Sequence, residues 1–199
     1  MLAGTGAAFT AAVAGCLGQL AGDGTDDGEA DNENDDDLDG AHYELTSTEQ
    51  PEGSPLDHEV RLVQPRIDSP DGPLTLEVTV TNTGTGTISY GEQRSAIGLH
   101  ERDGDFVWHP PSERPEFDEE AGLWFVPEPV AITMEFRVGE LEPGASDTQR
   151  LELIYDGKEL PESVPDEFDF DLTYGVMEGE GVPEEAGGFE WGFTLGRME

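Results

Sequence analysis

Cysteine and lysine are almost absent from this chain of 199 residues, which has one cysteine, Cys16, and one lysine, Lys158. A single cysteine cannot form a disulfide within the chain, so packing and hydrogen bonds must hold the fold together. Only nine basic side chains oppose 46 acidic ones, which gives a net charge of −37. This excess argues against binding to nucleic acid or to anionic lipid head groups, because both need a basic surface.

The acidic residues are spread over the whole chain, which favours a role in solvation over a specific acidic site. Self-repulsion of this size weakens a compact state at ordinary salt concentration. At molar salt the Debye length falls to about 3 Å and the repulsion is largely screened. The composition is therefore similar to that of proteins from salt-loving archaea.

The first 20 residues carry no charged side chain, and they contain the tetrapeptide Val13-Ala14-Gly15-Cys16. This tetrapeptide resembles a lipobox, the motif at which a signal peptide is cleaved and the cysteine receives lipid. The apolar stretch is shorter than the ~20 residues that span a bilayer, which suits a cleaved signal segment. A signal peptide normally begins with a basic residue, and this one has none. The alternative is that Cys16 is an ordinary free thiol.

Residues 1–15 are thus predicted to be a signal peptide, and residues 16–41 a lipidated cysteine followed by a disordered acidic tether. Residues 21–40 hold ten acidic residues and no basic one, a composition that cannot bury enough apolar surface to fold. Asp35, Asp37, Asp39 and Gly40 match the first half of a calcium-binding EF-hand loop, but the twelfth position is Thr46 instead of glutamate. We therefore expect loose association with cations and no specific calcium site.

Residues 42–199 are predicted to form one all-β domain of about eight strands, an immunoglobulin-like antiparallel β-sandwich without a convincing helix. The clearest strand covers residues 74–82, where apolar and polar residues alternate with period two. Asp103-Gly104 between two alternating runs predicts a hairpin. Other expected strands lie around residues 60–64, 97–99, 106–108, 130–138, 151–155, 168–176 and 189–195.

Two segments carry a resemblance to immunoglobulin-like domains of prokaryotic surface proteins. The first is the strand from Leu76 to Gly84, which ends in Asn-Thr-Gly, and the second runs from Val138 to Gly144. Tyr90-Gly91 adds to this likeness. Together with the lipobox and the acidic tether, the chain resembles haloarchaeal lipoproteins that carry an immunoglobulin-like β-sandwich domain. The resemblance implies a fold and a location but no activity.

No catalytic, cofactor or metal-binding motif is evident in the sequence, and we expect none of these groups. The four histidines show no metal-ligand spacing, although His100 and His109 could meet across the Asp103-Gly104 turn. The segment that stands out is the long, proline-rich and acidic connection over residues 110–129. The candidate ligand-binding residues are the aromatic ones in and beside it, namely Trp108, Trp124 and Phe125. The alternative is that Trp124 and Phe125 form a short extra strand or fold back on the sandwich edge.

These observations predict a lipoprotein at the cell surface, anchored through Cys16 to the outer face of the cytoplasmic membrane. Its domain would act by binding a surface protein or a glycan, without catalysis. One alternative is an accessory lipoprotein of a membrane complex. The other is a hydrolase that uses loop carboxylates, which would need two of them converging in a cleft.

Overall fold

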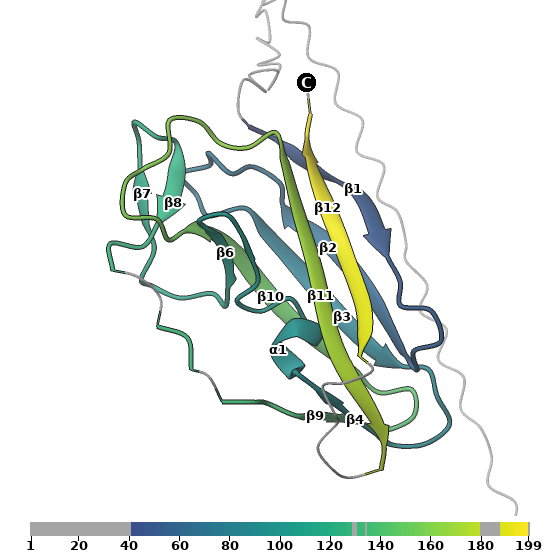
Figure 1. The fold of residues 1–199 in the computed structure, drawn as a ribbon. Coiled ribbons are helices and arrows are strands. Elements are labelled where there is room, and N and C mark those ends of the chain that lie inside the picture. Colours follow the sequence, from purple (N-terminus) through teal and green to yellow (C-terminus); the bar gives the residue numbers. More distant parts are fainter. Residues whose placement is uncertain (1–40, 129–130, 134, 180–187, 199) are drawn as a thin grey trace, which may run out of the picture. The chain divides into compact units, whose positions relative to one another are not determined.

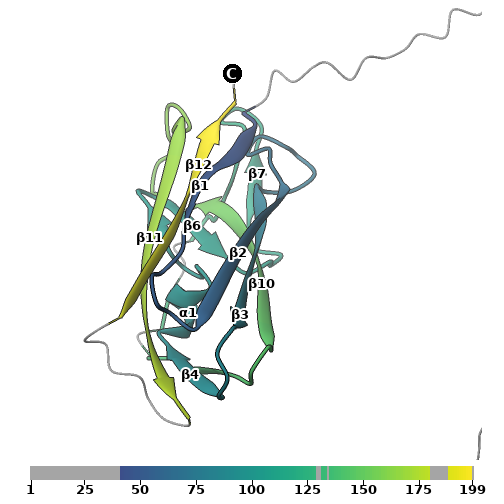
Figure 2. The same ribbon diagram turned by 90° about the vertical axis from the view of Figure 1, so that its right-hand side faces the viewer.

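The chain folds into two facing β-sheets in the computed structural model, which describes residues 41–128, 131–133, 135–179 and 188–198. The predicted lipobox, Cys16 and nearly all of the tether lie outside these residues. Figures 1 and 2 show the two sheets from the front and edge-on. The all-β class and the two-sheet arrangement predicted from the alternating pattern are confirmed. Among the described residues, no helix is long and apolar enough to cross a membrane.

The first sheet has five strands in the order β1-β12-β11-β4-β9, and every neighbouring pair in it is antiparallel. Its long central strands alternate sharply, so that Phe168, Phe170 and Leu172 of β11 face the interior while the acidic residues between them face solvent. The strands are β1 (Tyr43–Glu49), β4 (Ile88–Gly91), β9 (Gly139–Leu141), β11 (Glu167–Glu178) and β12 (Phe189–Arg197).

The second sheet has the strand order β2-β3-β10-β6-β5, with the β7–β8 hairpin attached through a parallel pairing of β8 with β10. The β5–β6 pair is the hairpin expected at Asp103-Gly104, and Gly104 has the positive φ, 58°, that this tight turn requires. The strands are β2 (Leu56–Gln64), β3 (Thr75–Asn82), β5 (Arg102–Asp103), β6 (Phe106–His109), β7 (Glu116–Asp118), β8 (Leu123–Phe125) and β10 (Ser146–Tyr155).

The core lies between the sheets and is rich in aromatic rings. Trp108 of β6 packs against Phe170 and Phe193 of the opposite sheet, with ring centroids 5.4 and 6.1 Å apart. A smaller apolar cluster covers the outer face of the second sheet, where Val107 and Ile154 pack beneath Trp124. The β7–β8 hairpin therefore acts as a cover for that face, which explains why all four residues of β6 are buried.

Two local predictions are wrong. The alternating segment 130–138 was expected to be a strand, but its described residues, 131–133 and 135–138, are not in one, and only β9 follows them. Residues 97–99 were expected to be a strand as well. They follow a single helical turn, α1 (Gln93–Ala96), which packs against β4 and β11. Both segments border the candidate site.

Candidate functional site

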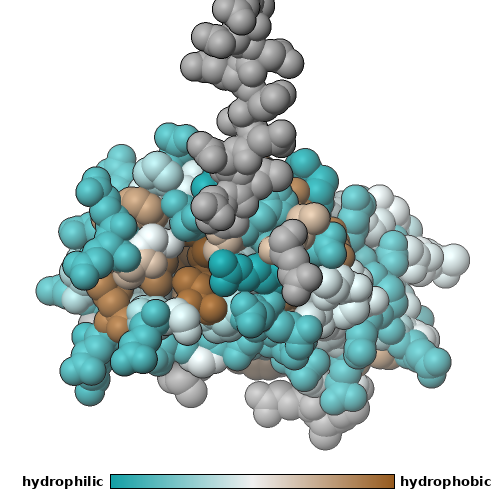
Figure 3. Space-filling model, turned by 90° about the horizontal axis from the view of Figure 1, so that it is seen from above, coloured by the Kyte–Doolittle hydropathy of each residue, from teal (hydrophilic) through white to brown (hydrophobic). Residues whose placement is uncertain are grey.

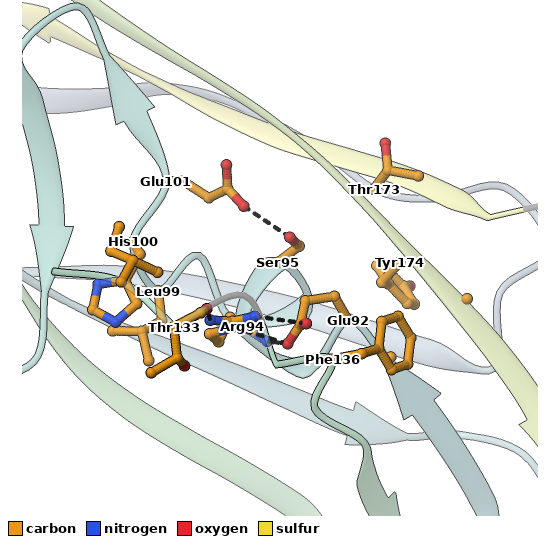
Figure 4. Close-up of a pocket in the computed structure, with 13 residues that line it drawn as sticks. Glu92, Arg94, Ser95, Leu99, His100, Glu101, Thr133, Phe136, Thr173 and Tyr174 are labelled. Atoms are coloured by element: carbon orange, nitrogen blue, oxygen red, sulfur yellow. Dashed lines mark hydrogen bonds and ion pairs between the residues drawn. The ribbon is translucent and has the colours of Figure 1, made fainter. Parts of the chain in front are cut away.

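A pocket of about 660 Å³ opens beside α1, at the end of the first sheet where β4 and β11 pair. Its volume lies within the range of about 300–1,000 Å³ that is typical of small-molecule sites. Figure 4 shows its walls, which come from α1, from the turn after it, from β11 and from the segment before β9. The lining residues are Gly91, Glu92, Arg94, Ser95, Leu99, His100, Glu101, Ile132, Thr133, Phe136, Thr173, Tyr174 and Gly175.

One side of the pocket is built on a paired carboxylate and guanidinium. Glu92 caps α1 by accepting a hydrogen bond from the backbone N–H of Arg94. Its two carboxylate oxygens also accept from Nε and Nη2 of Arg94, at 3.0 and 2.8 Å. Burial alone would raise the pKa of Glu92, but the hydrogen bonds from Arg94 and from the backbone of Arg137 lower it. Glu92 is therefore a firmly ionised, fully occupied group.

Arg94 also fixes the segment that forms the floor of the pocket. Its Nη1 and Nη2 groups donate to the backbone carbonyls of Thr133 and Glu135, at 2.6 and 2.7 Å. The backbone N–H of Arg137 donates to Glu92 at 3.1 Å. These bonds replace the strand ladder that the alternating pattern of residues 130–138 led us to expect. They hold the segment so that Ile132 and Phe136 line the pocket.

Phe136 approaches the backbone closely at Gly91. A Cβ atom built on Gly91 would lie 2.7 Å from Cε1 of Phe136 and 3.1 Å from the carbonyl oxygen of Arg137. Contacts below 3 Å are far inside van der Waals separation, so only glycine permits this packing. The aromatic wall of the pocket, which Figure 4 shows as Phe136 beside Tyr174, depends on the missing side chain.

The opposite side of the pocket carries Glu101, a carboxyl group without an ion pair to any described basic residue. Ser95 Oγ donates to its Oε1 at 2.8 Å. Burial raises the pKa of Glu101, and this effect outweighs the opposing hydrogen bond from Ser95 and the charge of Arg94. Two carboxyl groups of one pocket thus have pKa values shifted in opposite directions.

His100 stands at the far end of the pocket in a left-handed backbone conformation, with φ of 67°. Burial, with a smaller contribution from His109 and nearby arginines, lowers its pKa to about 4, so the ring is neutral at physiological pH. Its Nδ1 is shielded and has no hydrogen-bond partner among the described residues. The rings of His100 and His109 meet edge to face with centroids 5.6 Å apart, as the turn between them suggested. Within the described residues, no three ligand-type side chains are placed to hold a metal ion.

The aromatic residues singled out from the sequence lie elsewhere. Trp108 is completely buried, so its ring serves the core and presents no surface to a ligand. Trp124 and Phe125 form β8 and are half-buried, and Trp124 Nε1 donates to the carbonyl oxygen of Ser69 at 2.9 Å. Trp124 and Phe125 therefore occupy the extra strand that was the alternative interpretation, and none of the three residues lines the pocket.

The surface offers little apolar area for a flat interface. The face shown in Figure 3 is mostly hydrophilic, and its hydrophobic residues gather mainly in the left half of the view. Val138, Leu160 and Met198 are the large hydrophobic residues exposed in the described part of the chain, and their exposed fractions are between 38 and 48%. The mixed polar and aromatic pocket is the better candidate for recognition.

Comparison of the chain with protein-family models, with curated proteins and with solved structures finds no match.

Proposed function

We propose that the chain is a lipid-anchored cell-surface protein whose β-sandwich domain binds a ligand in the pocket beside α1. The observation that carries the binding role is the pocket itself, which combines one aromatic wall with polar groups held in fixed positions by Arg94 and Ser95. Positioned polar groups in a largely apolar cleft are the general mark of a recognition site.

The anchor rests on the lipobox-like tetrapeptide that ends at Cys16. A diacylated cysteine would supply the stable membrane attachment that one acyl chain does not give. The acidic tether of residues 16–41 would then lift the domain away from the membrane, since like charges extend such a segment. With a net charge of −37, the chain would not adhere to anionic lipid without such an anchor.

Membrane fractionation tests the anchor. In molar salt, we expect the parent chain in the membrane fraction and the Cys16→Ser variant in the soluble fraction. Mass spectrometry of the parent should show a mature chain that begins at a lipidated Cys16. Retention of Cys16→Ser on the membrane, or an intact first 15 residues with a free thiol, would show that the lipid anchor is wrong.

We also propose that the sandwich is of the immunoglobulin-like type. Two neighbour relationships support this: β3 pairs with β10, as strands B and E do, and β11 lies between β12 and β4, as strand F lies between G and C. There are two departures. First, β9 pairs with β4 in the place of strand C′, yet it follows β6, which takes the place of strand D beside β10, whereas C′ precedes D in an immunoglobulin domain. Second, β1 adds a strand beside β12. An experimental structure with other neighbours for β3 and β11 would contradict the assignment.

A hydrolase is the second candidate, because Glu92 and Glu101 line one pocket and have pKa values shifted in opposite directions. This separation is a pattern seen in acid–base pairs. Both oxygens of Glu92, however, are occupied by Arg94 and by backbone N–H groups, which leaves no free lone pair for a nucleophile or a water. Binding without catalysis is therefore the better-supported function. Turnover of a glycan substrate by the parent, lost in Glu101→Gln, would reverse this order.

A further inference from the structure

Charge is compensated on one side of the pocket and not on the other. On the α1 side, four of the five N–H groups of Arg94 are used: two by Glu92 and two by the carbonyl groups of Thr133 and Glu135. The guanidinium is thus neutralised and nearly saturated. It offers little to an anionic ligand, which the net charge of −37 would also repel.

Glu101 is the carboxyl group of the pocket whose charge is not compensated by a described basic residue. Its carboxyl accepts one hydrogen bond from the Ser95 hydroxyl and forms no ion pair with a described basic residue. Burial removes part of the water that would stabilise its charge, and this raises the pKa of Glu101. A cation placed beside a partly desolvated carboxylate restores the lost stabilisation. His100, neutral because its pKa is lowered to about 4, does not oppose such a cation.

The remaining walls suit the same kind of ligand. Phe136 and Tyr174 line the side of the pocket shown opposite Glu101 and His100 in Figure 4. Tyr174 is 1% exposed, and its hydroxyl is hydrogen-bonded to Ser54 Oγ at 2.8 Å, so Tyr174 supports this wall from the core. Phe136 is only partly buried and supplies the open ring. Aromatic ring faces attract ammonium groups through their quadrupole.

We propose that the pocket recognises an ammonium group of its ligand, with Glu101 as the counter-ion and with the ring of Phe136, supported from the core by Tyr174, as the aromatic wall. This inference rests on the proposed binding function and narrows it to a chemical class. A neutral sugar would donate hydrogen bonds to the carboxylate of Glu101 without compensating its charge, and an anionic group would be repelled by it.

Choline and its uncharged isostere 3,3-dimethylbutan-1-ol are the matched probes, since they share shape and differ in charge. Binding to the full chain can be followed by NMR through the indole N–H of Trp191, which donates to the carbonyl oxygen of Ser95 at 3.0 Å and so reports on the pocket wall. At constant molar salt, choline should shift this signal saturably, and the isostere should bind about tenfold more weakly or worse.

Two variants locate the effect. Glu101→Gln should weaken choline binding about tenfold or more, and should leave the weak binding of the isostere unchanged. Glu119→Gln alters the net charge equally at an exposed site on the β7–β8 turn, and should bind choline like the parent. Circular dichroism would verify that both variants are folded.

Three outcomes would overturn the inference: no response to choline, equal affinity for the two probes, or equal weakening by the two substitutions. A neutral monosaccharide that shifts the Trp191 signal when choline does not would reject the ammonium ligand and retain the pocket as a binding site. The anchoring part of the proposed function is tested separately by fractionation, so each can fail without the other.

Discussion

The imidazole ring of His58 lies stacked on the indole ring of Trp191, with centroids 4.3 Å apart and planes inclined by 24°. His58 is 3% exposed, and neither ring nitrogen has a hydrogen-bond partner of normal geometry among the described residues. Burial lowers the pKa of His58 to about 4, against a weak opposing effect from the backbone of Ala96. A histidine on β2 is thus part of the apolar core directly beneath α1.

This burial predicts a pH-dependent loss of stability. Well above pH 6.5, His58 is neutral in both the folded and the unfolded chain. As the pH falls from 6.5 to about 4, the unfolded chain takes up a proton that the folded chain does not. The free energy of unfolding should fall over that interval by about 3 kcal/mol at most, since each pKa unit is worth about 1.4 kcal/mol.

Urea denaturation of the parent and of His58→Phe between pH 7.5 and 4.5 checks this prediction. Carboxylate titration affects both proteins, so it cancels in the difference between their unfolding free energies. A constant offset would report packing alone, whereas a difference that grows in favour of the variant as the pH falls reports the titration of His58. Parallel pH profiles would mean that His58 titrates normally.

The Glu92–Arg94 pair predicts a second effect on stability. The side chains of Glu92 and Arg94 are 19% and 13% exposed, and removal of the arginine would leave a poorly solvated carboxylate. We expect Arg94→Met to cost about 2–3 kcal/mol of unfolding free energy. Arg61, which pairs with Glu77 and is 62% exposed, is the matched control, and Arg61→Met should cost no more than about 0.5 kcal/mol.

Urea titrations at one salt concentration compare these variants. The double variant Glu92→Gln/Arg94→Met should recover part of the loss, because it removes the stranded charge as well as its partner. Equal costs at Arg61 and Arg94 would show that the pocket pair is no stronger than a surface pair.

The β-sandwich was predictable because its long strands report their own environment. From Leu76 to Thr81 of β3 and from Glu167 to Tyr174 of β11, the apolar residues face the core and the polar residues between them are more exposed, so the sequence alternates where the strand is half-buried. The alternation of residues 130–138 misled for an instructive reason. Ile132 and Phe136 do share one side, since both line the pocket, but the backbone carbonyl groups of this segment accept hydrogen bonds from Arg94 and not from a strand. Side-chain period alone does not identify the hydrogen-bond partner.

The pocket was not predictable from the sequence for a related reason. Glu92, Arg94 and Glu101 are three charged residues in a chain with 46 acidic side chains, and nothing in their spacing distinguishes them. They come together through a single helical turn, which is too short to show a 3.6-residue period. Trp108, Trp124 and Phe125 were more conspicuous in the sequence, yet aromatic residues near strands most often serve packing, as Trp108 does here.

The contact between Gly91 and Phe136 predicts a third effect. In Gly91→Ala the new methyl group would displace the Phe136 ring, because the carbonyl oxygen of Arg137 blocks the other direction. We expect a loss of about 1–3 kcal/mol, typical of an overpacked site. Gly86→Ala is the control, since its Cβ would meet no atom within 4 Å, and it should be nearly neutral.

A double-mutant cycle separates the ring from the backbone. The cost of Gly91→Ala, measured by urea denaturation, should be smaller in a Phe136→Leu background, because the shorter side chain leaves room for the methyl group. If the cost is the same in both backgrounds, the strain lies in the backbone and the ring is not its cause.

The net charge of −37 predicts that folding depends on salt. At molar salt, repulsion among surface carboxylates is screened over about 3 Å, and at ~0.1 M over about 10 Å. Circular dichroism and tryptophan fluorescence should show that the domain melts when NaCl is lowered from ~2 M to ~0.1 M, and that it refolds when salt is restored. A transition temperature that stays the same at both concentrations would contradict the screening argument.

The backbone conformation of His100 predicts that glycine is a more stable substitution than alanine at this position, the reverse of the usual order. His100 and Glu101 together pair with one residue, Trp108. The N–H of His100 donates to the carbonyl oxygen of Trp108 at 2.8 Å, and the N–H of Trp108 donates to the carbonyl oxygen of Glu101 at 3.0 Å. This is the pattern of a β-bulge whose first position, with φ of 67°, is normally glycine. A Cβ at positive φ costs about 1–2 kcal/mol. His100→Gly should therefore be more stable than His100→Ala by about 1 kcal/mol, after allowance for the greater freedom of glycine in the unfolded chain.

At Glu44, an exposed position on β1, the order should be the ordinary one, with Glu44→Ala more stable than Glu44→Gly by about 0.5–1 kcal/mol. Thermal and urea unfolding of the four variants decide the matter. If alanine is the more stable substitution at both positions, His100 is not strained, and the pocket holds its imidazole at no conformational cost.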